Sequence, residues 1–571
     1  MTQTDERTTS AKYRAARTTS LVAGVFSGIF AALLIVNLIG SAVIGPAREN
    51  ELAAMKAQVL EEPGNEELVA EIRALDLEIR RNRIWRLDFS RKASYMLLAS
   101  VVLFLIAAKL ASDMSEEPPR PEHLAERGEA QVQEAKQSRW AVAGGLAVLA
   151  VGMAGIWMSG SVEFVQAEEA KPTFATLQEK REQWHRFRGP AGAGVSAYVS
   201  VPASWNGETG ENILWKTPVP LPGRSSPILW EDRIFVTGAT EEDREVYCFD
   251  ANSGTLLWKG DVPTTPAAAQ AELHIMEDTG HAACTPATDG ERVFAIFATG
   301  DIAGFDFNGR RLWHRNLGVP ESAYGYATSL DTYNNLVLIQ YDQGYGDEGK
   351  SRVYALDALS GRTVWEAKRE EIPNSWTTPI VISVDGQDQL ITVADPWVIA
   401  YDPADGQEIW RVECVGGDVA PAPIYAGGLV MAIEPYAQVV AIKPTGKGNV
   451  TETHIAWRME EGAPDICSPV SNGEYVYLME SEGYMLCCKV ADGTLAFEHD
   501  LKASFRASPS VVGDKLYNLS MEGVMHIGQI GPEYKELGRA ELGENCYASP
   551  IFADGRIYIR ADENLYGIGQ K

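Results

Sequence analysis

Cysteine and histidine are the residue types in this chain most able to bind a metal or carry redox chemistry. The sequence has seven cysteines and eight histidines. The histidines show no metal-ligand spacing, and no CxxC or CxxCH motif occurs, so zinc-ribbon and covalent haem sites are not supported. The odd number of cysteines leaves at least one thiol unpaired. The cysteines are Cys248, Cys284, Cys414, Cys467, Cys487, Cys488 and Cys546.

A second set of candidate functional residues precedes a motif that recurs along the C-terminal two thirds of the chain. Its members are Arg224, Tyr326, Trp376, Arg506 and Tyr547. If the repeats form a ring, these residues lie at one mouth of its central channel. Two arginines and three aromatic rings then suit an anionic planar ligand or a peptide. The alternative is that these side chains pack together and close the channel.

The recurring motif predicts the fold that has to position these residues. A small or hydroxyl residue meets proline or an equivalent, and then an apolar strand, a tight polar turn and a second apolar strand follow. Successive motifs are 59, 43, 50, 44, 46, 40 and 41 residues apart, a period typical of four-stranded propeller blades. The sequence therefore predicts an all-β, eight-bladed propeller. The motifs begin at Ser226-Pro227, Thr285-Pro286, Thr328-Ser329, Thr378-Pro379, Ala422-Pro423, Ser468-Pro469, Ser508-Pro509 and Ser549-Pro550.

A second hairpin, of the form Asp-x-x-x-Gly-x-x-x-Trp, ends several of the predicted blades. Clear copies run from Asp250 to Trp258, from Asp357 to Trp365 and from Asp402 to Trp410. An outer-strand tryptophan, Trp215, precedes the first motif, whereas only 21 residues follow Pro550. We therefore expect the strand around Trp215 to complete the last blade and close the ring, which removes exposed sheet edges.

Three apolar stretches precede the predicted propeller and suit helices that cross a bilayer. Apolar residues at spacings of three and four, interrupted by Pro63-Gly64-Asn65, also predict a helical hairpin, with two separate surface helices as the alternative. The predicted segments are a cytoplasmic tail (1–19), a membrane helix (20–44), the hairpin (45–93), a second membrane helix (94–111), a loop (112–139), a third membrane helix (140–159), a linker (160–183) and the propeller (184–571).

The charge of the segments between the membrane helices does not decide their topology. With the N-terminus inside, the two inner segments hold four Lys+Arg each, whereas the outer hairpin holds nine. No Lys or Arg occurs from residue 141 to 170, although Glu163, Glu168 and Glu169 do. A poorly basic flank after the third helix favours an outward-facing propeller, and we predict that topology.

The charge of the predicted propeller limits its partners. Residues 184–571 carry 29 Lys+Arg against 54 Asp+Glu. Such an acidic surface is a poor candidate for binding nucleic acid or an anionic membrane. A cationic partner, or solubility alone, explains the charge better.

The hairpin motif resembles the repeat of the PQQ-like, or quinoprotein-type, β-propellers. The segments 184–190 (WHRFRGP) and 213–216 (ILWK) are similar to those of a large bacterial group of such propellers. Relatives with this fold include the non-enzymatic propeller lipoprotein of the outer-membrane β-barrel assembly machine and the quinoprotein alcohol dehydrogenases. The resemblance implies that the repeat tryptophans pack blade against blade, namely Trp215, Trp258, Trp313, Trp365, Trp410 and Trp457.

The dehydrogenases of this family join two adjacent cysteines in a strained disulfide against their cofactor, and this chain has Cys487-Cys488. Alignment of Gly493 with Gly254 places Cys487 opposite Cys248, within the third strand of a blade. Adjacent residues of a regular strand point to opposite faces, so we do not expect the disulfide loop. No calcium ligands or catalytic aspartate are found at matching positions. We expect no cofactor, with pyrroloquinoline quinone and calcium as the alternative.

Degenerate repeats, short loops and the lack of a nucleophile or metal motif favour binding over catalysis. We expect a non-catalytic scaffold for protein partners in the envelope, anchored in the bacterial inner membrane with its propeller in the periplasm. The main alternative is an accessory subunit of a membrane redox complex, and the second is a quinoprotein dehydrogenase. We predict no catalytic residues, no metal site and no nucleic-acid partner.

Overall fold

The computed structural model describes residues 13–34, 37, 89–90, 92–111 and 174–570, except 272 and 274. The chain divides into two units, Met1–Glu168 and Glu169–Lys571. The predicted hairpin at 45–93 lies almost entirely outside the described residues. The predicted loop at 112–139, the predicted third membrane helix at 140–159 and the first part of the linker lie wholly outside them.

Two helices are described in the first unit, Tyr13–Leu34 and Lys92–Ala111, and both are long and apolar enough to cross a membrane. The first begins within the predicted tail. Their contacts run in opposite directions along the two sequences: Ser27 Oγ donates to Ser100 Oγ at 2.9 Å, and Asn37 Nδ2 donates to Ser90 Oγ at 2.7 Å. The two helices are therefore antiparallel.

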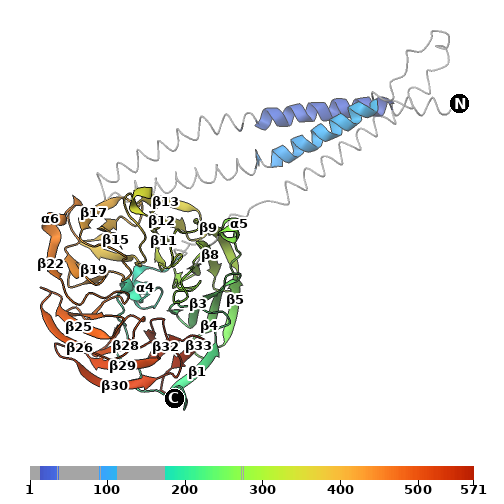
Figure 1. The fold of residues 1–571 in the computed structure, drawn as a ribbon. Coiled ribbons are helices and arrows are strands. Elements are labelled where there is room, and N and C mark those ends of the chain that lie inside the picture. Colours follow the sequence, from blue (N-terminus) through green and yellow to red (C-terminus); the bar gives the residue numbers. More distant parts are fainter. Residues whose placement is uncertain are drawn as a thin grey trace, which may run out of the picture. The chain divides into compact units, whose positions relative to one another are not determined.

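The second unit is a ring of eight sheets, which confirms the predicted eight-bladed propeller (Figure 1). Each blade has four antiparallel strands, numbered here from the channel outward. Blades 1 and 2 comprise β2 (Ile228–Trp230), β3 (Arg233–Ala239), β4 (Arg244–Asp250), β5 (Leu256–Asp261), β6 (Ala287–Thr288), β7 (Arg292–Ile296), β8 (Asp301–Asp306) and β9 (Arg311–Asn316). Blades 3 and 4 comprise β10 (Asp331–Tyr333), β11 (Leu336–Tyr341), β12 (Arg352–Asp357), β13 (Thr363–Lys368), β14 (Ile380–Val384), β15 (Gln387–Ala394), β16 (Trp397–Tyr401) and β17 (Glu408–Glu413).

The remaining four blades follow the same plan, and short helices lie in the connections. Blades 5 and 6 comprise β18 (Ile424–Ala426), β19 (Leu429–Glu434), β20 (Gln438–Ile442), β22 (Ile455–Met459), β23 (Val470–Ser471), β24 (Tyr475–Met479), β25 (Tyr484–Lys489) and β26 (Leu495–Asp500). Blades 7 and 8 comprise β27 (Ser510–Val512), β28 (Lys515–Leu519), β29 (Val524–Gln529), β30 (Lys535–Glu541), β31 (Ile551–Ala553), β32 (Arg556–Arg560), β33 (Asn564–Ile568) and β1 (Ile213–Pro218). The connections hold α5 (Pro266–Gln270), η3 (Gly346–Glu348) and α6 (Thr451–His454).

Blade 8 combines strands from the two ends of the propeller sequence. β1 pairs antiparallel with β33, with Ile213 opposite Ile568 and Pro218 opposite Asn564. The tryptophan of this strand, Trp215, then contacts blade 1, because its Nε1 donates to the Ala251 carbonyl at 3.1 Å.

The recurring hydroxyl residues have a shared structural role at the start of the inner strands. At seven of the eight positions the backbone N–H donates to the hydroxyl of the counterpart in the next blade, at 2.9 to 3.2 Å. The circuit is interrupted after Thr378, because its counterpart Ala422 has no hydroxyl. The donor-to-acceptor pairs are Ser226 to Thr285, Thr285 to Ser329, Ser329 to Thr378, Ala422 to Ser468, Ser468 to Ser508, Ser508 to Ser549 and Ser549 to Ser226.

The predicted start of blade 3 is wrong by one residue. Ser329, and not Thr328, occupies the place of Thr285 and Thr378 in the circuit. Leu330 therefore takes the place of the proline, so the Thr-Ser pair was aligned one position too early.

The repeat tryptophans pack blade against blade. In five of them Nε1 donates to a carbonyl of the following blade at 2.9 to 3.2 Å. The turn glycine of that blade lies over the indole, and a Cβ there would come within 2.4 to 2.8 Å of the ring. The glycine of the motif is thus required by close approach as well as by its positive φ. The donor and carbonyl pairs are Trp215 to Ala251, Trp258 to Phe307, Trp313 to Ala358, Trp365 to Pro403 and Trp457 to Val490.

Trp410 is the exception, because the following blade carries an insertion. Part of the insertion forms β21 (Gly448–Asn449), which pairs in parallel with β17 as a fifth strand of blade 4. The indole of Trp410 is fully buried and donates instead to Gln389 Oε1 at 2.8 Å.

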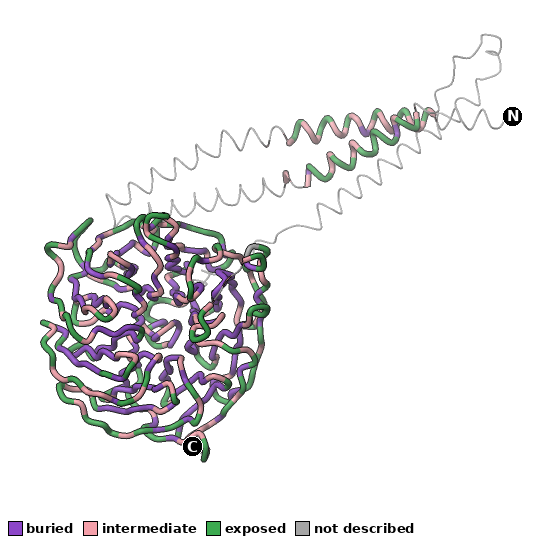
Figure 2. Tube along the Cα trace, in the orientation of Figure 1, coloured by how far each residue is buried: buried purple, intermediate pink, exposed green. Residues whose placement is uncertain are grey.

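Burial falls from the inner strands to the outer ones, as Figure 2 shows. Every residue of β7 is buried, whereas β5 is mostly exposed. All seven cysteines are buried and free. Cys487 and Cys488 lie within β25, opposite Tyr477 and Val476 of β24, as the register of the repeat predicts.

Candidate functional site

The chain segment before the ring lies at the centre of the ring and contacts several blades. This segment, residues 174–196, is called the hub; it contains α4 (Leu177–Arg181) and the 3-10 turn η2 (Pro190–Gly192). Figure 1 shows α4 at the centre of the ring. The hub bridges to β2 through Trp184 and Leu229, and to β27 through Val195 and Val511.

Arg186 ties the hub to two further blades. Its guanidinium forms an ion pair with Asp331 at the start of β10 and donates to the carbonyl of Pro379 at 2.7 Å. Arg186 is 1% exposed, so the charge is held away from water. Burial lowers the pKa of Arg186, and the Asp331 carboxylate offsets only part of that effect. Removing one partner would leave the other charge buried and unpaired, which strongly destabilises a fold. The pair is therefore a structural connection between the hub and blade 3.

Arg188 has no carboxylate partner among residues 174–570 and is held by carbonyl oxygens. It donates to the carbonyls of Pro469 and Pro509, which precede the inner strands of blades 6 and 7. It also donates to Ala193 and Gly192 of the hub itself. Burial lowers its pKa to about 9, which leaves it charged at neutral pH.

The hub also carries a lysine in the channel. Lys180 is 3% exposed, and its Nζ donates to the Thr332 hydroxyl at 2.8 Å and to the Thr332 carbonyl at 3.0 Å. Burial is the main cause that lowers its pKa to about 8, against the opposing effect of Asp331. Together, Lys180, Arg186 and Arg188 contact blades 3, 4, 6 and 7 from one segment.

Two of the five predicted rim residues contact each other. Arg224 lies over the Tyr547 ring, with Cζ 3.7 Å from the ring centroid, and forms an ion pair with Asp562. Both residues are half-buried. The guanidinium is therefore already neutralised by this chain's own carboxylate.

The other three rim residues each contact neighbouring residues that do not belong to the predicted set. Trp376 meets Tyr324 edge-on at 5.0 Å and donates from Nε1 to Ser322 Oγ at 3.1 Å. Tyr326 is buried, stacks on Tyr341 at 4.8 Å and donates to the Gln340 carbonyl. Arg506 is half-buried and donates to the carbonyl of Phe505. Of these five residues, all within the part of the chain that the structure describes, only Arg224 and Tyr547 are in contact with each other.

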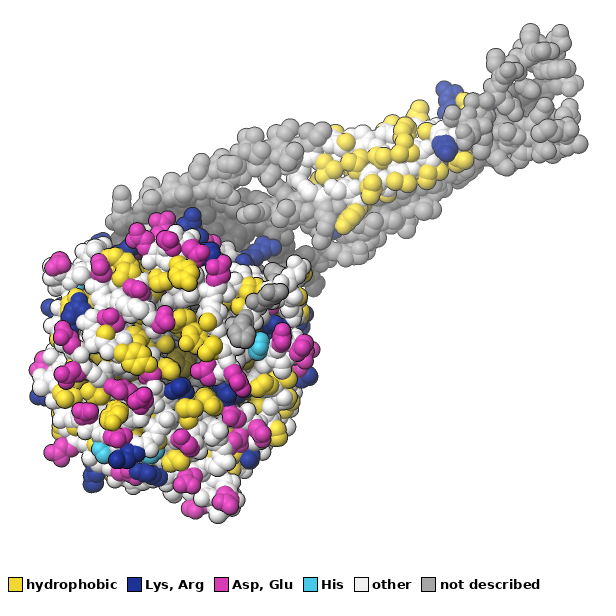
Figure 3. Space-filling view, in the orientation of Figure 1, with side chains coloured by type: hydrophobic (Ala, Val, Ile, Leu, Met, Phe, Trp, Pro, Cys, Tyr) yellow, Lys and Arg dark blue, Asp and Glu magenta, His cyan; other side chains and the backbone are white. Residues whose placement is uncertain are grey.

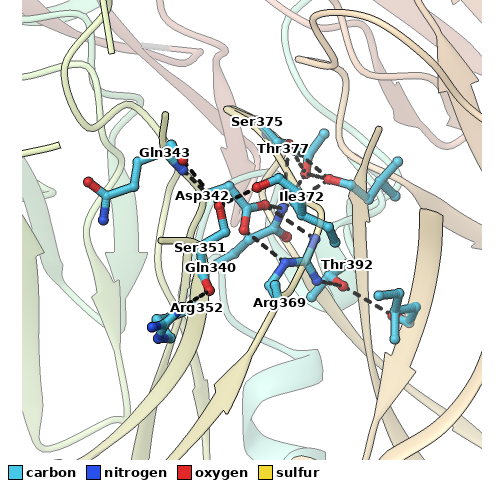
Figure 4. A network of polar contacts seen from close by, with 12 residues as sticks. Gln340, Asp342, Gln343, Ser351, Arg352, Arg369, Ile372, Ser375, Thr377 and Thr392 are labelled. Carbon is cyan, nitrogen blue, oxygen red and sulfur yellow. Dashed lines mark hydrogen bonds and ion pairs between the residues drawn. The ribbon is translucent and has the colours of Figure 1, made fainter. Parts of the chain in front are cut away.

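A buried polar network joins blades 3 and 4 beside this mouth (Figure 4). The ion pair of Arg369 with Asp342 has both side chains fully buried, at 2.8 Å. Burial opposes the charge of Arg369, but Asp342 and Tyr401 together more than offset it, and the pKa of Arg369 lies above its usual value. Gln340 donates to the Val393 carbonyl and to Thr377 of blade 4. The charged groups of Arg369 and Asp342 therefore help to hold blades 3 and 4 together.

A calcium-bound quinone needs oxygen ligands and, in the quinoprotein dehydrogenases, a pair of adjacent disulfide-bonded cysteines. Calcium in proteins takes six to eight oxygen ligands, several of them carboxylates. Over residues 174–570 and the two N-terminal helices, no group of three His, Cys, Asp or Glu side chains could hold a metal ion. Cys487 and Cys488 are both free and lie within β25, with a β-bulge between them in the pairing with β26, so the disulfide loop of the quinoprotein dehydrogenases is not formed there.

The face seen in Figure 3 is hollowed near the centre of the ring. Hydrophobic side chains surround the hollow, and carboxylates are spread over the rest of the face.

Sequence reasoning missed the hub as a structural element. The segment 184–190 was noted only as part of a resemblance, although two arginines in seven residues next to Trp184 are a signal for buried charge. Their partners in the blades lie 145 to 321 residues away in the sequence, so no local pattern identifies them.

The comparisons with known proteins agree with this architecture. A family model described as outer membrane protein assembly factor BamB matches residues 189–331 and 349–464. The tetrathionate hydrolase of Acidithiobacillus ferrooxidans is 22% identical over 257 residues, which cover 42% of this chain and 46% of that enzyme. The chain therefore spans less than half the length of this curated relative.

Solved structures share the fold at low sequence identity. Quinohemoprotein alcohol dehydrogenase from Comamonas testosteroni is 12% identical with a TM-score of 0.52, over 72% of this chain and 83% of that one. BamB from Moraxella catarrhalis is 14% identical with a TM-score of 0.47, over 62% of this chain and 99% of that one. At such identities the likeness shows the fold alone. The propeller of this chain thus resembles the PQQ-like β-propellers, and part of it matches the model of the BamB family.

Proposed function

We propose that the protein is a membrane-anchored scaffold whose propeller binds protein partners and carries out no catalysis. The observation that carries this proposal is the hub, which occupies the channel and uses its buried cations to bind the blades. The residues at the centre of the ring therefore hold the blades together, and the outer surfaces are available to bind partner proteins. A propeller supplies a platform, and its function depends on the sites on that platform.

We further infer that the protein lies in the bacterial inner membrane with the propeller in the periplasm. The two apolar helices, Tyr13–Leu34 and Lys92–Ala111, support membrane anchoring by length and composition. The resemblance to BamB supports an envelope location. Protease added to intact spheroplasts is expected to digest the propeller, and full protection would contradict this topology.

We also infer that the β1–β33 pair closes the ring. The pairing joins the first and last strands of the propeller sequence, and Trp215 extends it to blade 1. A ring closed this way has no exposed sheet edge between its ends. Closure gives a scaffold a single rigid surface for its partners.

The scaffold function is tested by cross-linking the full-length protein in its native membranes and purifying it. We expect a defined partner protein in stoichiometric yield. Purification of the protein without any partner, combined with turnover of a substrate by the protein alone, would overturn the proposal.

A further inference from the structure

One exposed aromatic residue lies in an unusual backbone conformation at the mouth end of the ring. Tyr436 occupies the turn between β19 and β20, with 83% of its surface exposed. Its φ is 62°, in the left-handed region that favours glycine. The turn begins with Glu434-Pro435, and the Ala437 N–H donates to the Glu434 carbonyl at 3.1 Å. This is the pattern of a type II turn, where glycine is the usual third residue.

Three chain segments meet at Tyr436, in the junction between blades 5 and 6. The Tyr436 hydroxyl donates to Asp465 Oδ2 at 3.2 Å, and the Ser481 hydroxyl also donates to this carboxylate. Asp465 belongs to the connection from β22 to β23, and Ser481 to the turn between β24 and β25. We call Tyr436, residues 460–466 and residues 480–484 the mouth surface. In antiparallel blades these connections lie at the same end of the ring as the predicted rim.

The mouth surface combines exposed apolar area with negative charge. Ile466 and Tyr484 are 39% and 41% exposed. The exposed carboxylates are those of Glu460, Glu461 and Glu482. Burial, and then the neighbouring carboxylates of Asp465 and Glu482, raise the pKa of Glu480. Basic residues also lie close to this surface: the charge of Arg506 acts on Tyr436, Arg458 donates to Gln438, and the exposed Lys502 follows Leu501, whose N–H donates to the Gly483 carbonyl.

We infer that the mouth surface docks a lysine- or arginine-rich segment of a protein partner, with Tyr436 as the central contact. An exposed aromatic face attracts ammonium and guanidinium groups, and carboxylates around it add charge complementarity. An aromatic residue in a turn that favours glycine is expected where the ring itself is needed. The inference rests on the proposed scaffold function and identifies the face and the chemistry of its partner.

The test uses the full-length protein in detergent and a fluorescein-labelled nonapeptide of alternating lysine and glycine, followed by anisotropy. Tyr436→Gly is expected to weaken binding by roughly threefold to tenfold, the size of a cation–π contact. The same variant is expected to melt at or above the wild-type temperature, because glycine relieves the left-handed backbone. Loss of binding with retained stability separates recognition from folding.

Two matched controls sharpen the test. Tyr345→Ala removes another tyrosine that is 76% exposed, in the connection between β11 and β12 of blade 3, and is expected to leave binding unchanged. The triple variant E460Q/E461Q/E482Q is expected to weaken binding and to reduce its salt dependence, whereas E241Q/E242Q/D243N on blade 1 is not. Equal losses from both triple variants would show diffuse attraction and overturn the inference.

Cross-linking in native membranes then separates this inference from the scaffold function. Release of the native partner by Tyr436→Gly supports both. Retention of the partner by this variant overturns the mouth surface and leaves the scaffold. A wild-type protein that holds no partner overturns both.

Discussion

The hub and the mouth surface both carry charge, but they use it in opposite ways. In the hub, Arg186 and Arg188 are buried and donate to Asp331 and to carbonyls of three blades. On the mouth surface, Glu460, Glu461 and Glu482 are exposed around an exposed ring. Buried charge is stable only when partnered within the fold, whereas exposed charge stays available to a partner. The buried charges of the hub therefore hold the ring together, whereas the exposed charges of the mouth surface are free to bind a partner protein.

The largest effect is expected from removing one partner of the buried hub pair. Arg186→Met leaves Asp331 buried without its cation, and we expect a loss of about 3–5 kcal/mol in the free energy of unfolding. Denaturant unfolding measures it. Arg310→Met is the matched control, because the pair of Arg310 with Asp306 is exposed and worth at most about 1 kcal/mol. An equal, small loss in both variants would show that the hub does not hold the ring.

The closure of the ring is tested by a tryptophan at the junction of the two sequence ends. Trp215→Ala is expected to cost about 3–5 kcal/mol, as a large-to-small change of a buried aromatic residue does. The matched variant is Trp365→Ala, which removes an equally buried indole between blades 3 and 4. Similar losses indicate a closed ring, whereas a much smaller loss at Trp215 would indicate an open junction.

Because Lys180 of the hub is buried, we expect it to make the free energy of unfolding depend on pH above neutrality. The folded-state pKa of Lys180 is lowered from 10.5 to about 8, so the unfolded chain binds more protons between these values. Stability contributed by this group therefore rises with pH through about 8, by about 1 kcal/mol between pH 7.5 and 9. The difference in unfolding free energy between wild type and Lys180→Met isolates it from other titrating groups. A difference that does not change with pH would mean that Lys180 is not buried as a cation.

The smallest effect is expected where the hydroxyl circuit is interrupted. Ala422→Ser supplies an acceptor for the Thr378 N–H and is expected to stabilise the fold by about 1 kcal/mol. The converse change, Ser468→Ala, removes the acceptor of the Ala422 N–H and is expected to destabilise it by about 1–3 kcal/mol. Thermal melting of the two variants checks both signs. Destabilisation by Ala422→Ser would mean that the site has no room for the hydroxyl.

The repeated elements were predictable because each is encoded locally. The motifs at Ser226-Pro227 and at seven later positions mark the blades, and the Asp-x-x-x-Gly-x-x-x-Trp hairpin marks their outer strands. The register also placed Cys487 and Cys488 in the third strand of their blade, where they lie in β25, although a β-bulge separates them in the pairing with β26. The slip at Thr328 arose because blade 3 has Leu330 in place of proline, so the local signal at that blade is ambiguous.

The candidate site was less predictable because it depends on contacts between distant segments. The convergence of Arg224 and Tyr547 follows from the ring, but the ion pair with Asp562 does not follow from any motif. Arg188 contacts residues 281 and 321 positions away. Tyr436 appears in the sequence as an ordinary turn tyrosine, and only its φ and its exposure distinguish it.

We propose that the hub occupies the channel of this propeller and that the propeller holds no quinone. Titration of the full-length protein in detergent with pyrroloquinoline quinone and calcium, followed by quinone absorbance and tryptophan fluorescence, tests it most directly. The account predicts no stoichiometric binding and no dye-linked alcohol oxidation. One equivalent of quinone bound tightly, with a fluorescence change that Trp376→Phe abolishes, would contradict it.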